Sequence, residues 1–324
     1  MLPETRYAYA VARVRVAELN MLGKSRIERM IEADTAASAL RVLNEAGYAE
    51  SDDYEFILKK AASDLYAYMK EISPEPQIFD IFAYRYDGHN IKVLIKAEFT
   101  GSDGEGLFAD NGVFDVNSLA LMVRERDVRR LPPEFASAVI ESIDAYSRTR
   151  DPQIIDIIMD GAYYVLFKRL AEAAGSSYLS DLAAMTIDIA NINAFIRIKA
   201  RMVDLDLLSR VLIKGGRIPV KRYTDCFGRD IAGFREEIKG SGYGGLLDMI
   251  IDNPAGLTEF EKACDNHIMD YLRKFRFKAF GIEPLVGYML GRETDIKNAR
   301  IILVGKINRI NGDIIRERLR NGYV

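Results

Sequence analysis

The chain has 324 residues, with 45 lysines and arginines against 48 aspartates and glutamates, and a net charge of −3. This balance excludes a global basic field of the kind that recruits nucleic acid, and two cysteines, Cys226 and Cys264, exclude a disulfide framework and indicate a reducing cytoplasm. Apolar runs such as 301–304 are far shorter than the ~20 residues of a membrane span, and residues 1–22 carry too many charges for a secretory signal, so we expect membrane association only through a protein partner.

The predicted elements are helical throughout. Apolar residues at helical spacing predict an amphipathic helix over 4–22, which we expect to pair with either the last segment or the first unit of the chain. Long helices are predicted over 54–70, 161–174 and 260–274, each preceded by a further helical element at 26–45, 116–130 and 219–237. The glycine-rich segments 101–106 and 240–245 indicate loops, and no strand-rich region stands out.

A short pattern, Asp-x-x-Asn followed by a mostly apolar run, occurs three times. The copies begin at Asp87, Asp188 and Asp295, 101 and 107 residues apart (188 − 87 and 295 − 188), and their asparagines are Asn90, Asn191 and Asn298. The glycine turns 111–113 and 215–217 are separated by a similar 104 residues (215 − 111).

Repetition at this period predicts one helical unit used three times. We therefore expect an all-α protein of three similar subdomains: the N-terminal helix with the first subdomain (1–105), the second (106–208) and the third (209–324).

Apolar residues follow each motif aspartate at the fourth, seventh and eighth positions, as Ile91, Leu94 and Ile95 follow Asp87. On a helix these positions share a face with the aspartate and asparagine, which places the polar pair on the core side. A carboxylate there needs donors, and the free N–H groups of a helix N-terminus supply them. We therefore interpret the aspartate as a helix N-cap, contributing ~1 kcal/mol, with the asparagine reaching back as in a capping box.

A metal site is the alternative interpretation of the same residues. Inward-facing Asp87, Asp188 and Asp295 could together hold Mg²⁺, as carboxylate oxygens do in helical hydrolases and prenyl-diphosphate enzymes. Such sites usually pack several carboxylates on one motif, whereas each motif here carries one acid and belongs to a separate unit. Capping is the favoured interpretation.

Other candidate sites give weaker signals. His89 lies inside the first motif but has Ala190 and Lys297 as its counterparts, which favours a surface residue in a first helical turn. The Cys264–His267 pair, one helical turn apart, lacks a third orienting residue for nucleophilic catalysis.

The glycine-rich and arginine-rich segments point to no chemistry either. Segment 240–245 lacks the Lys-Ser/Thr ending of a phosphate-binding loop. Two arginine clusters favour a solvated face or a protein-docking surface over nucleic acid: Arg124, Arg126, Arg129 and Arg130, and Arg316, Arg318 and Arg320. We predict no catalytic, cofactor or metal site.

An ordered set of segments resembles the C subunit of V/A-type ATP synthases, the prokaryotic counterpart of the d subunit of vacuolar ATPases. The segments are 9–15, 87–92, 187–192, 213–217 and 284–306, and they spread over nearly the whole chain. The resemblance implies three similar helical subdomains around a pseudo-threefold axis, forming a funnel. One departure is Ala299, which stands where isoleucine follows the asparagine in the other two copies; this suits a structural interpretation of the motif.

The function implied by the resemblance is mechanical. The funnel would sit on the cytoplasmic face of the membrane proteolipid ring, receive the tip of the central shaft made by subunits D and F, and transmit torque without a catalytic site or cofactor. The motifs define no partner-contact residues. Two further hypotheses remain: a helical Mg-dependent hydrolase using the repeated aspartates, and a generic helical scaffold.

Overall fold

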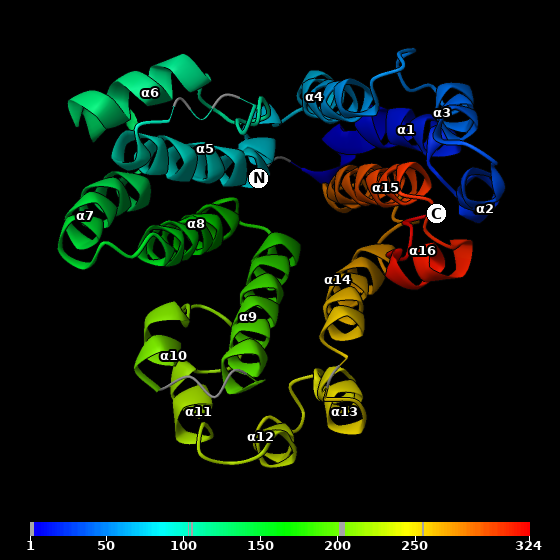
Figure 1. The fold of residues 1–324 in the computed structure, drawn as a ribbon. Helices are drawn as coiled ribbons and strands as arrows, with labels where there is room; N and C mark the ends of the chain where they lie inside the picture. Colours follow the sequence, from blue (N-terminus) through cyan, green and yellow to red (C-terminus); the bar gives the residue numbers. More distant parts are fainter. Residues whose placement is uncertain (1–2, 103, 105, 201–204, 255) are drawn as a thin grey trace. The chain divides into compact units, whose positions relative to one another are not determined.

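The computed structural model describes residues 3–102, 104, 106–200, 205–254 and 256–324, and no strand occurs within them (Figure 1). The α-helices are α1 Ala8–Ala17, α2 Lys24–Glu32, α3 Ala36–Glu45, α4 Tyr54–Ile72, α5 Asp80–Thr100, α6 Val116–Glu125, α7 Pro133–Thr149, α8 Gln153–Ala173, α9 Ser177–Ala200, α10 Leu205–Val211, α11 Val220–Asp225, α12 Ile231–Glu237, α13 Gly244–Asp252, α14 Leu257–Arg273, α15 Glu283–Ile307 and α16 Gly312–Arg318. Short 3₁₀ helices are η1 Glu4–Tyr7, η2 Glu18–Asn20, η3 Pro76–Phe79 and η4 Val128–Arg130. The prediction of an all-helical protein is confirmed for the described residues.

The chain divides into two compact units. Unit 1 is formed by Ile78–Ala255, and unit 2 by Leu2–Gln77 together with Gly256–Val324. Unit 2 therefore joins the first and last parts of the sequence. The three-subdomain division at 1–105, 106–208 and 209–324 stays a prediction.

The N-terminal helix predicted over 4–22 is present as η1, α1 and η2 in succession. The sequence left open whether this helix pairs with the last segment or with the first unit of the chain. It contacts both, because α1 packs against α15 of the last segment and against α4 of the first predicted unit. Ala10, Val11 and Val14 form its buried face.

The predicted long helices are present as α4, α8 and α14, with α8 starting well before the predicted 161. Each element predicted upstream of them is broken in two. Residues 26–45 contain α2 and α3 because Thr35, in extended conformation, accepts from the Ser38 N–H and starts a new helix. Residues 116–130 contain α6 and η4, separated where Arg126 adopts a left-handed φ of 57°. Residues 219–237 contain α11 and α12.

Several helices begin with an aspartate whose side chain accepts backbone N–H groups. Asp53 opens α4, Asp115 opens α6 and Asp230 opens α12. These satisfy donors that have no partner within the helix. None of them belongs to the Asp-x-x-Asn motif.

Each unit has its own apolar core. In unit 1, Ile91, Leu119, Phe135 and Leu166 bring α5, α6, α7 and α8 together. A second, aromatic cluster in the same unit packs Phe195 of α9 against Tyr223 and Phe234, with ring centroids 6.0 and 4.3 Å apart.

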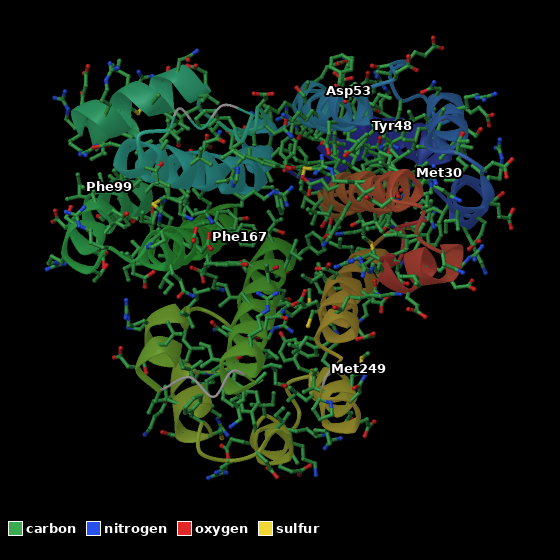
Figure 2. All side chains as sticks on the ribbon, viewed as in Figure 1. Met30, Tyr48, Asp53, Phe99, Phe167 and Met249 are labelled. Atoms are coloured by element: carbon green, nitrogen blue, oxygen red, sulfur yellow. The ribbon has the colours of Figure 1, made fainter. Side chains whose placement is uncertain are left out.

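In unit 2, α15 lies at the centre and packs against α1, α2, α3, α4, α14 and α16. Figure 2 shows the side chains that fill these spaces, with Met30 of α2 and Tyr48 of the α3–α4 connection labelled; both residues belong to one core cluster. The long motif-bearing helix is thus the common packing partner of the whole unit.

Among the described residues, α9 alone is long and apolar enough to cross a membrane by length and composition, although the sequence showed only shorter apolar runs. Its most apolar 18-residue window has a mean hydropathy of 1.2, and 67% of that window is buried inside the protein. Burial within unit 1 accounts for this hydropathy, because a helix surrounded by other elements is apolar on most sides.

Candidate functional site

The three motif aspartates lie well inside the longest helices of their regions. Asp87, Asp188 and Asp295 are 7, 11 and 12 residues beyond the first residues of α5, α9 and α15 (87 − 80, 188 − 177 and 295 − 283). All three, and their asparagines, have an exposed fraction of 0%. The interpretation as helix N-caps is therefore wrong; the prediction that the polar pair faces the core is confirmed.

Each motif asparagine binds both backbone groups of one residue in a distant segment. Asn90 donates to Ala109 O (2.8 Å) and accepts from Ala109 N (2.9 Å). Asn191 makes the same pair with Ile213 (both 2.8 Å), and Asn298 with Arg320 (both 2.9 Å). A side-chain amide has the one donor and one acceptor side by side that this pairing needs.

In the first two motifs, the aspartate accepts hydrogen bonds from backbone N–H groups that lie four and five residues after the partner of the asparagine. Asp87 accepts from Val113 N (2.8 Å) and Phe114 N (3.1 Å). Asp188 accepts from Arg217 N (2.9 Å), Ile218 N (3.0 Å) and, in addition, the hydroxyl of Tyr243 (2.9 Å). We call each Asp–Asn pair with its bound backbone a clamp.

A glycine lies directly before the donating residue in the first two clamps. A Cβ at Gly112 would overlap Asp87 Oδ1, and a Cβ at Gly216 would overlap Asp188 Oδ1. Only glycine lets the carboxylate come this close to the backbone. The turns 111–113 and 215–217, whose similarity the sequence showed, are the binding partners of the first two motifs.

The third clamp is completed by a different part of the chain. By analogy with the first two clamps, the donor to Asp295 would lie four residues after Arg320, at Val324. The actual donor to Asp295 Oδ2 is Leu22 N, at 2.9 Å and 273 positions away. Met21 takes the place of the glycine, and the next backbone donor, Gly23 N, donates to Met21 O at 3.0 Å instead of to the carboxylate. Asp295 Oδ1 has no hydrogen-bond partner among the described residues.

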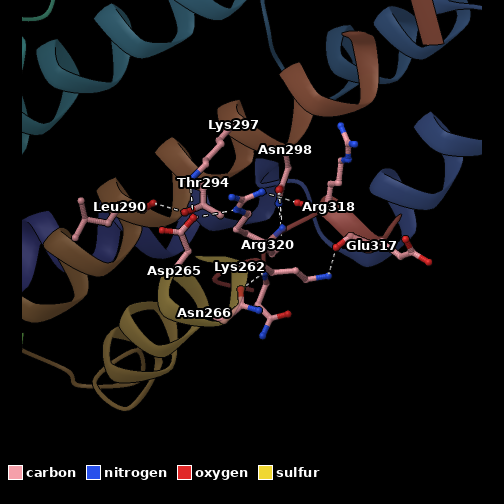
Figure 3. Close-up of polar contacts among 11 residues, drawn as sticks. Lys262, Asp265, Asn266, Leu290, Thr294, Lys297, Asn298, Glu317, Arg318 and Arg320 are labelled. Atoms are coloured by element: carbon pink, nitrogen blue, oxygen red, sulfur yellow. Dashed lines mark hydrogen bonds and ion pairs between the residues drawn. The ribbon is translucent and has the colours of Figure 1, made fainter. Parts of the chain in front are cut away.

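Figure 3 shows the asparagine half of the third clamp. The Arg320 backbone pairs with Asn298, and the Arg320 side chain donates to Asp265 of α14 at 2.9 Å. Lys297 donates to the same carboxylate at 2.6 Å, and Asn321 N donates to Asn266 Oδ1 at 2.8 Å. The segment 320–324 is therefore fixed between α14 and α15.

Burial sets the electrostatics of these carboxylates. It raises the pKa of Asp188, against which the hydrogen bonds from Ile218, Tyr243 and Arg217 act. It raises the pKa of Asp295 to about 7, against the Leu22 hydrogen bond and the charges of Arg292 and Arg26. The pKa of Asp295 stays raised because the carboxylate has a single backbone donor, and the nearest guanidinium nitrogen, of Arg292, is 3.8 Å from its Oδ2.

The geometry does not suit the magnesium interpretation. Both oxygens of Asp87 and of Asp188 face N–H or O–H donors, which occupy the lone pairs a cation would need. Within the described ranges, no three residues among His, Cys, Asp and Glu gather as metal ligands do. The aspartates for which the sequence allowed a magnesium site thus make stabilising hydrogen bonds to the backbone.

The remaining candidate residues take ordinary positions. His89 is exposed as predicted, with its Nε2 2.8 Å from Leu107 O, but it lies in the middle of α5 and not in a first turn. Cys264 is buried in α14 and His267 is half-buried. Of the loop predicted over 240–245, residues 240–243 form a turn, whereas Gly244 and Gly245 are the first residues of α13.

Among the described residues, five of the seven arginines in the two clusters form ion pairs, the exceptions being Arg130 and Arg318. Arg126 pairs with Glu98 at 2.6 Å and Arg129 with Asp127 at 2.7 Å. In the second cluster, Arg316 pairs with Glu28 at 3.0 Å and Arg320 with Asp265 at 2.9 Å. These charges are paired within the protein, which favours the solvated or structural interpretation over binding of a polyanion.

An all-helical protein held by buried side-chain-to-backbone clamps is the class that fold and site define. The chain matches the model of the family described as ATP synthase (C/AC39) subunit over residues 10–318, and it belongs to that family.

Its curated relatives agree over almost their whole length. It is 27% identical to the C subunit of the V-type sodium ATPase of Enterococcus hirae, covering 96% of this chain and 97% of that one. It is 24% identical to the C subunit of the A-type ATP synthase of Methanocaldococcus jannaschii (97% and 86% covered) and 23% identical to that of Methanothermobacter thermautotrophicus (93% and 84%). The family is thus a component of a membrane-associated, multi-subunit ATP synthase.

Proposed function

We propose that this chain is a non-catalytic rotor subunit of a V/A-type rotary ATPase or ATP synthase. It couples the central shaft, made by subunits D and F, to the membrane proteolipid ring on the cytoplasmic face and passes torque between them. The observation that carries the proposal is the family match over residues 10–318, supported by relatives whose names describe them as C subunits of such complexes. The pseudo-threefold funnel belongs to the same proposal.

The clamps support a mechanical role. An element that passes torque must not yield between the parts it connects, and side chains buried at 0% exposure with bonds to distant backbone resist such yielding. Their loss would expose unpaired buried polar groups, each costing about 1–3 kcal/mol. The carboxylates of Asp87 and Asp188, by contrast, have both oxygens occupied by backbone donors and are not available to a substrate.

Large apolar side chains remain exposed on α1, on η2 and in the α14–α15 connection of unit 2. Tyr9, Val16 and Leu19, on or directly after α1, are 62%, 66% and 74% exposed, and Phe277 in the α14–α15 connection is 83% exposed. Arg15 of α1 donates to the carbonyls of Arg276 and Lys278, so this connection is fixed on α1. Exposed apolar residues on a rigid support are typical of a protein-binding surface. We propose that they contact a partner protein of the complex.

Co-purification tests the proposed function. The chain is expressed with subunits D and F and, separately, with the detergent-solubilised proteolipid ring from the same genome. We expect stable complexes with both. Retention of neither, over a range of salt concentrations, would contradict the rotor proposal and leave a scaffold for other partners.

A further inference from the structure

The third clamp differs from the other two in where its donor comes from and in how completely its carboxylate is satisfied. Asp87 and Asp188 bind backbone that follows them in sequence by at most 30 positions. Asp295 binds Leu22, in the segment 18–23 near the start of the chain. This segment therefore reaches α15 from a distant part of the sequence. Its apolar residues Met21 and Leu22 are each 1% exposed, and Leu22 belongs to the core cluster that includes residues of α15.

Few polar contacts hold the segment on α15. Leu22 N donates to Asp295 at 2.9 Å, and the Arg292 guanidinium donates to Asn20 O at 3.2 Å. The segment's other polar contacts are with elements other than α15. Arg26 of α2 donates to Leu19 O and Met21 O, and Glu18 pairs with Arg15 of α1 at 2.7 Å and with Arg276 of the α14–α15 connection at 4.0 Å. Asp295 and Arg292 are thus the polar attachment points on α15.

Asp295 is held in surroundings that penalise its charge. Its side chain has no exposed surface, its Oδ1 has no partner among the described residues, and Gly23 N, the next backbone donor after Leu22, donates to Met21 O at 3.0 Å instead. The titratable and charged groups that act on it are Arg292 and Tyr288 of α15, Arg26 of α2 and Tyr48 of the α3–α4 connection. The two arginines favour the charged form, but neither donates a hydrogen bond to it.

We propose that residues 18–23 form a pH-sensitive latch, which stays closed on α15 while Asp295 is neutral and opens more readily as Asp295 ionises. Opening would bring water to the carboxylate and remove the penalty on its charge. It would also loosen α1, which precedes the latch and carries Tyr9 and Val16. The latch is a property of the isolated chain and does not depend on the proposed rotor function.

The sign follows from the burial of Asp295. Its pKa of about 7 in the closed state lies above the ordinary carboxyl value of about 4 that it would regain when the latch opens. The closed state is therefore fully favoured below about pH 4 and loses stability as pH rises towards 7, with no further loss above it. Between pH 5 and pH 8 the opening constant should rise by up to about 80-fold if opening rehydrates the carboxylate completely.

Amide hydrogen exchange of the isolated, full-length chain tests the latch. The exchange of the Leu22 amide is measured from pH 5 to pH 8 and divided by its intrinsic rate at each pH, with the Val113 and Arg217 amides as matched controls bound to Asp87 and Asp188. We expect the opening constant of Leu22 to rise at least tenfold over this range and to rise more than that of either control. Parallel behaviour of the three amides would overturn the proposal.

Two variants assign the effect. Asp295→Asn keeps an acceptor for Leu22 but cannot ionise, so the excess pH dependence of Leu22 should disappear; its persistence in a folded variant would assign it to another group and overturn the latch. Arg292→Gln removes the cation that opposes the burial effect, so the upper end of the pH window should move above 7. An unmoved window in this second variant would also contradict the proposal, should Asp295→Asn fail to fold.

Discussion

At the scale of single residues, the pairing of an aspartate or asparagine with a distant backbone segment decides the roles of the motif. A mid-helix carboxylate with no exposed surface is unfavourable unless donors reach it, and backbone N–H groups of a turn are donors that carry no charge of their own. A glycine directly before the donors is also needed, because the turn can approach the carboxylate closely only when no Cβ lies between them.

Gly216→Ala should destabilise the protein by about 2 kcal/mol or more. The new Cβ would overlap Asp188 Oδ1, and the carboxylate would have to move away from Arg217 N and Ile218 N. Urea unfolding followed by circular dichroism measures the change in free energy.

Gly161→Ala is the matched control for that variant. Gly161 lies inside α8 of the same unit, and a Cβ there meets no atom within 4 Å. The substitution should stabilise the helix by about 0.5–1 kcal/mol. Equal effects of the two alanines would show that close approach to Asp188 has no energetic consequence.

At the scale of elements, the clamps attach each long helix to the connection that leads to another helix. The motif helices α5 and α9 hold the turns that lead to α6 and to α11, and α15 holds the segment that leads to α2. The same side chains thus set where the next helix begins. The sequence pattern favoured an N-cap at the start of the motif's own helix, because a capping pattern considers only neighbours within one or two helical turns.

Asn191→Ala should destabilise unit 1 by about 2–4 kcal/mol. It leaves the N–H and C=O of Ile213 without their partners while the site stays buried, and an unpaired buried group costs about 1–3 kcal/mol. The unfolding free energy, again from urea titration, is the measurement.

Asn193→Ala, two residues along α9, is its control. The Asn193 amide donates only to Ile189 O of its own helix, and its Oδ1 has no partner among the described residues. Alanine is also the better helix former, so the change should stay within about 0.5–1 kcal/mol. A cost for Asn193→Ala as large as that for Asn191→Ala would contradict the clamp as the source of stability.

At the scale of the whole molecule, the proposed coupling role requires rigid units and exposed surfaces for partners. Alpha-helices packed on central helices such as α15 supply the first. The clearest exposed surface residue in unit 2 is Phe277, which is 83% exposed. The guanidinium carbon of Arg276 lies 5.1 Å from the centroid of its ring. Exposing a phenylalanine to water to this extent costs free energy that a partner would recover.

Phe277→Ser should weaken co-purification with at least one partner, shaft or ring, by about tenfold without lowering the melting temperature of the isolated chain. The serine removes apolar contact area at an interface and no core packing. Phe56→Ser is the matched control, because Phe56 is a 51% exposed phenylalanine on α4 of the same unit, outside the proposed surface. Unchanged binding to both partners would remove Phe277 from the contact surface.

The sequence by itself determined the helical class, the approximate extent of α4 and α14, the threefold motif, its core-facing orientation and the similarity of the two glycine turns. These follow from apolar spacing and from residue types at fixed offsets, which are local properties of the chain. It also carried the family resemblance, which the family match over residues 10–318 confirms.

Only the tertiary structure decided what the motif binds. The partners of Asn90, Asp188 and Asp295 lie 19, 29 and 273 positions away, and no local pattern specifies which backbone donors reach a buried carboxylate. The two glycine turns were a signal, but only folding brings Gly216 against Asp188 and shows that Met21 and Leu22 take the corresponding place at Asp295. Hydrogen bonds that satisfy buried polar groups form between whichever elements the core packs together, and that packing is settled by the whole chain at once.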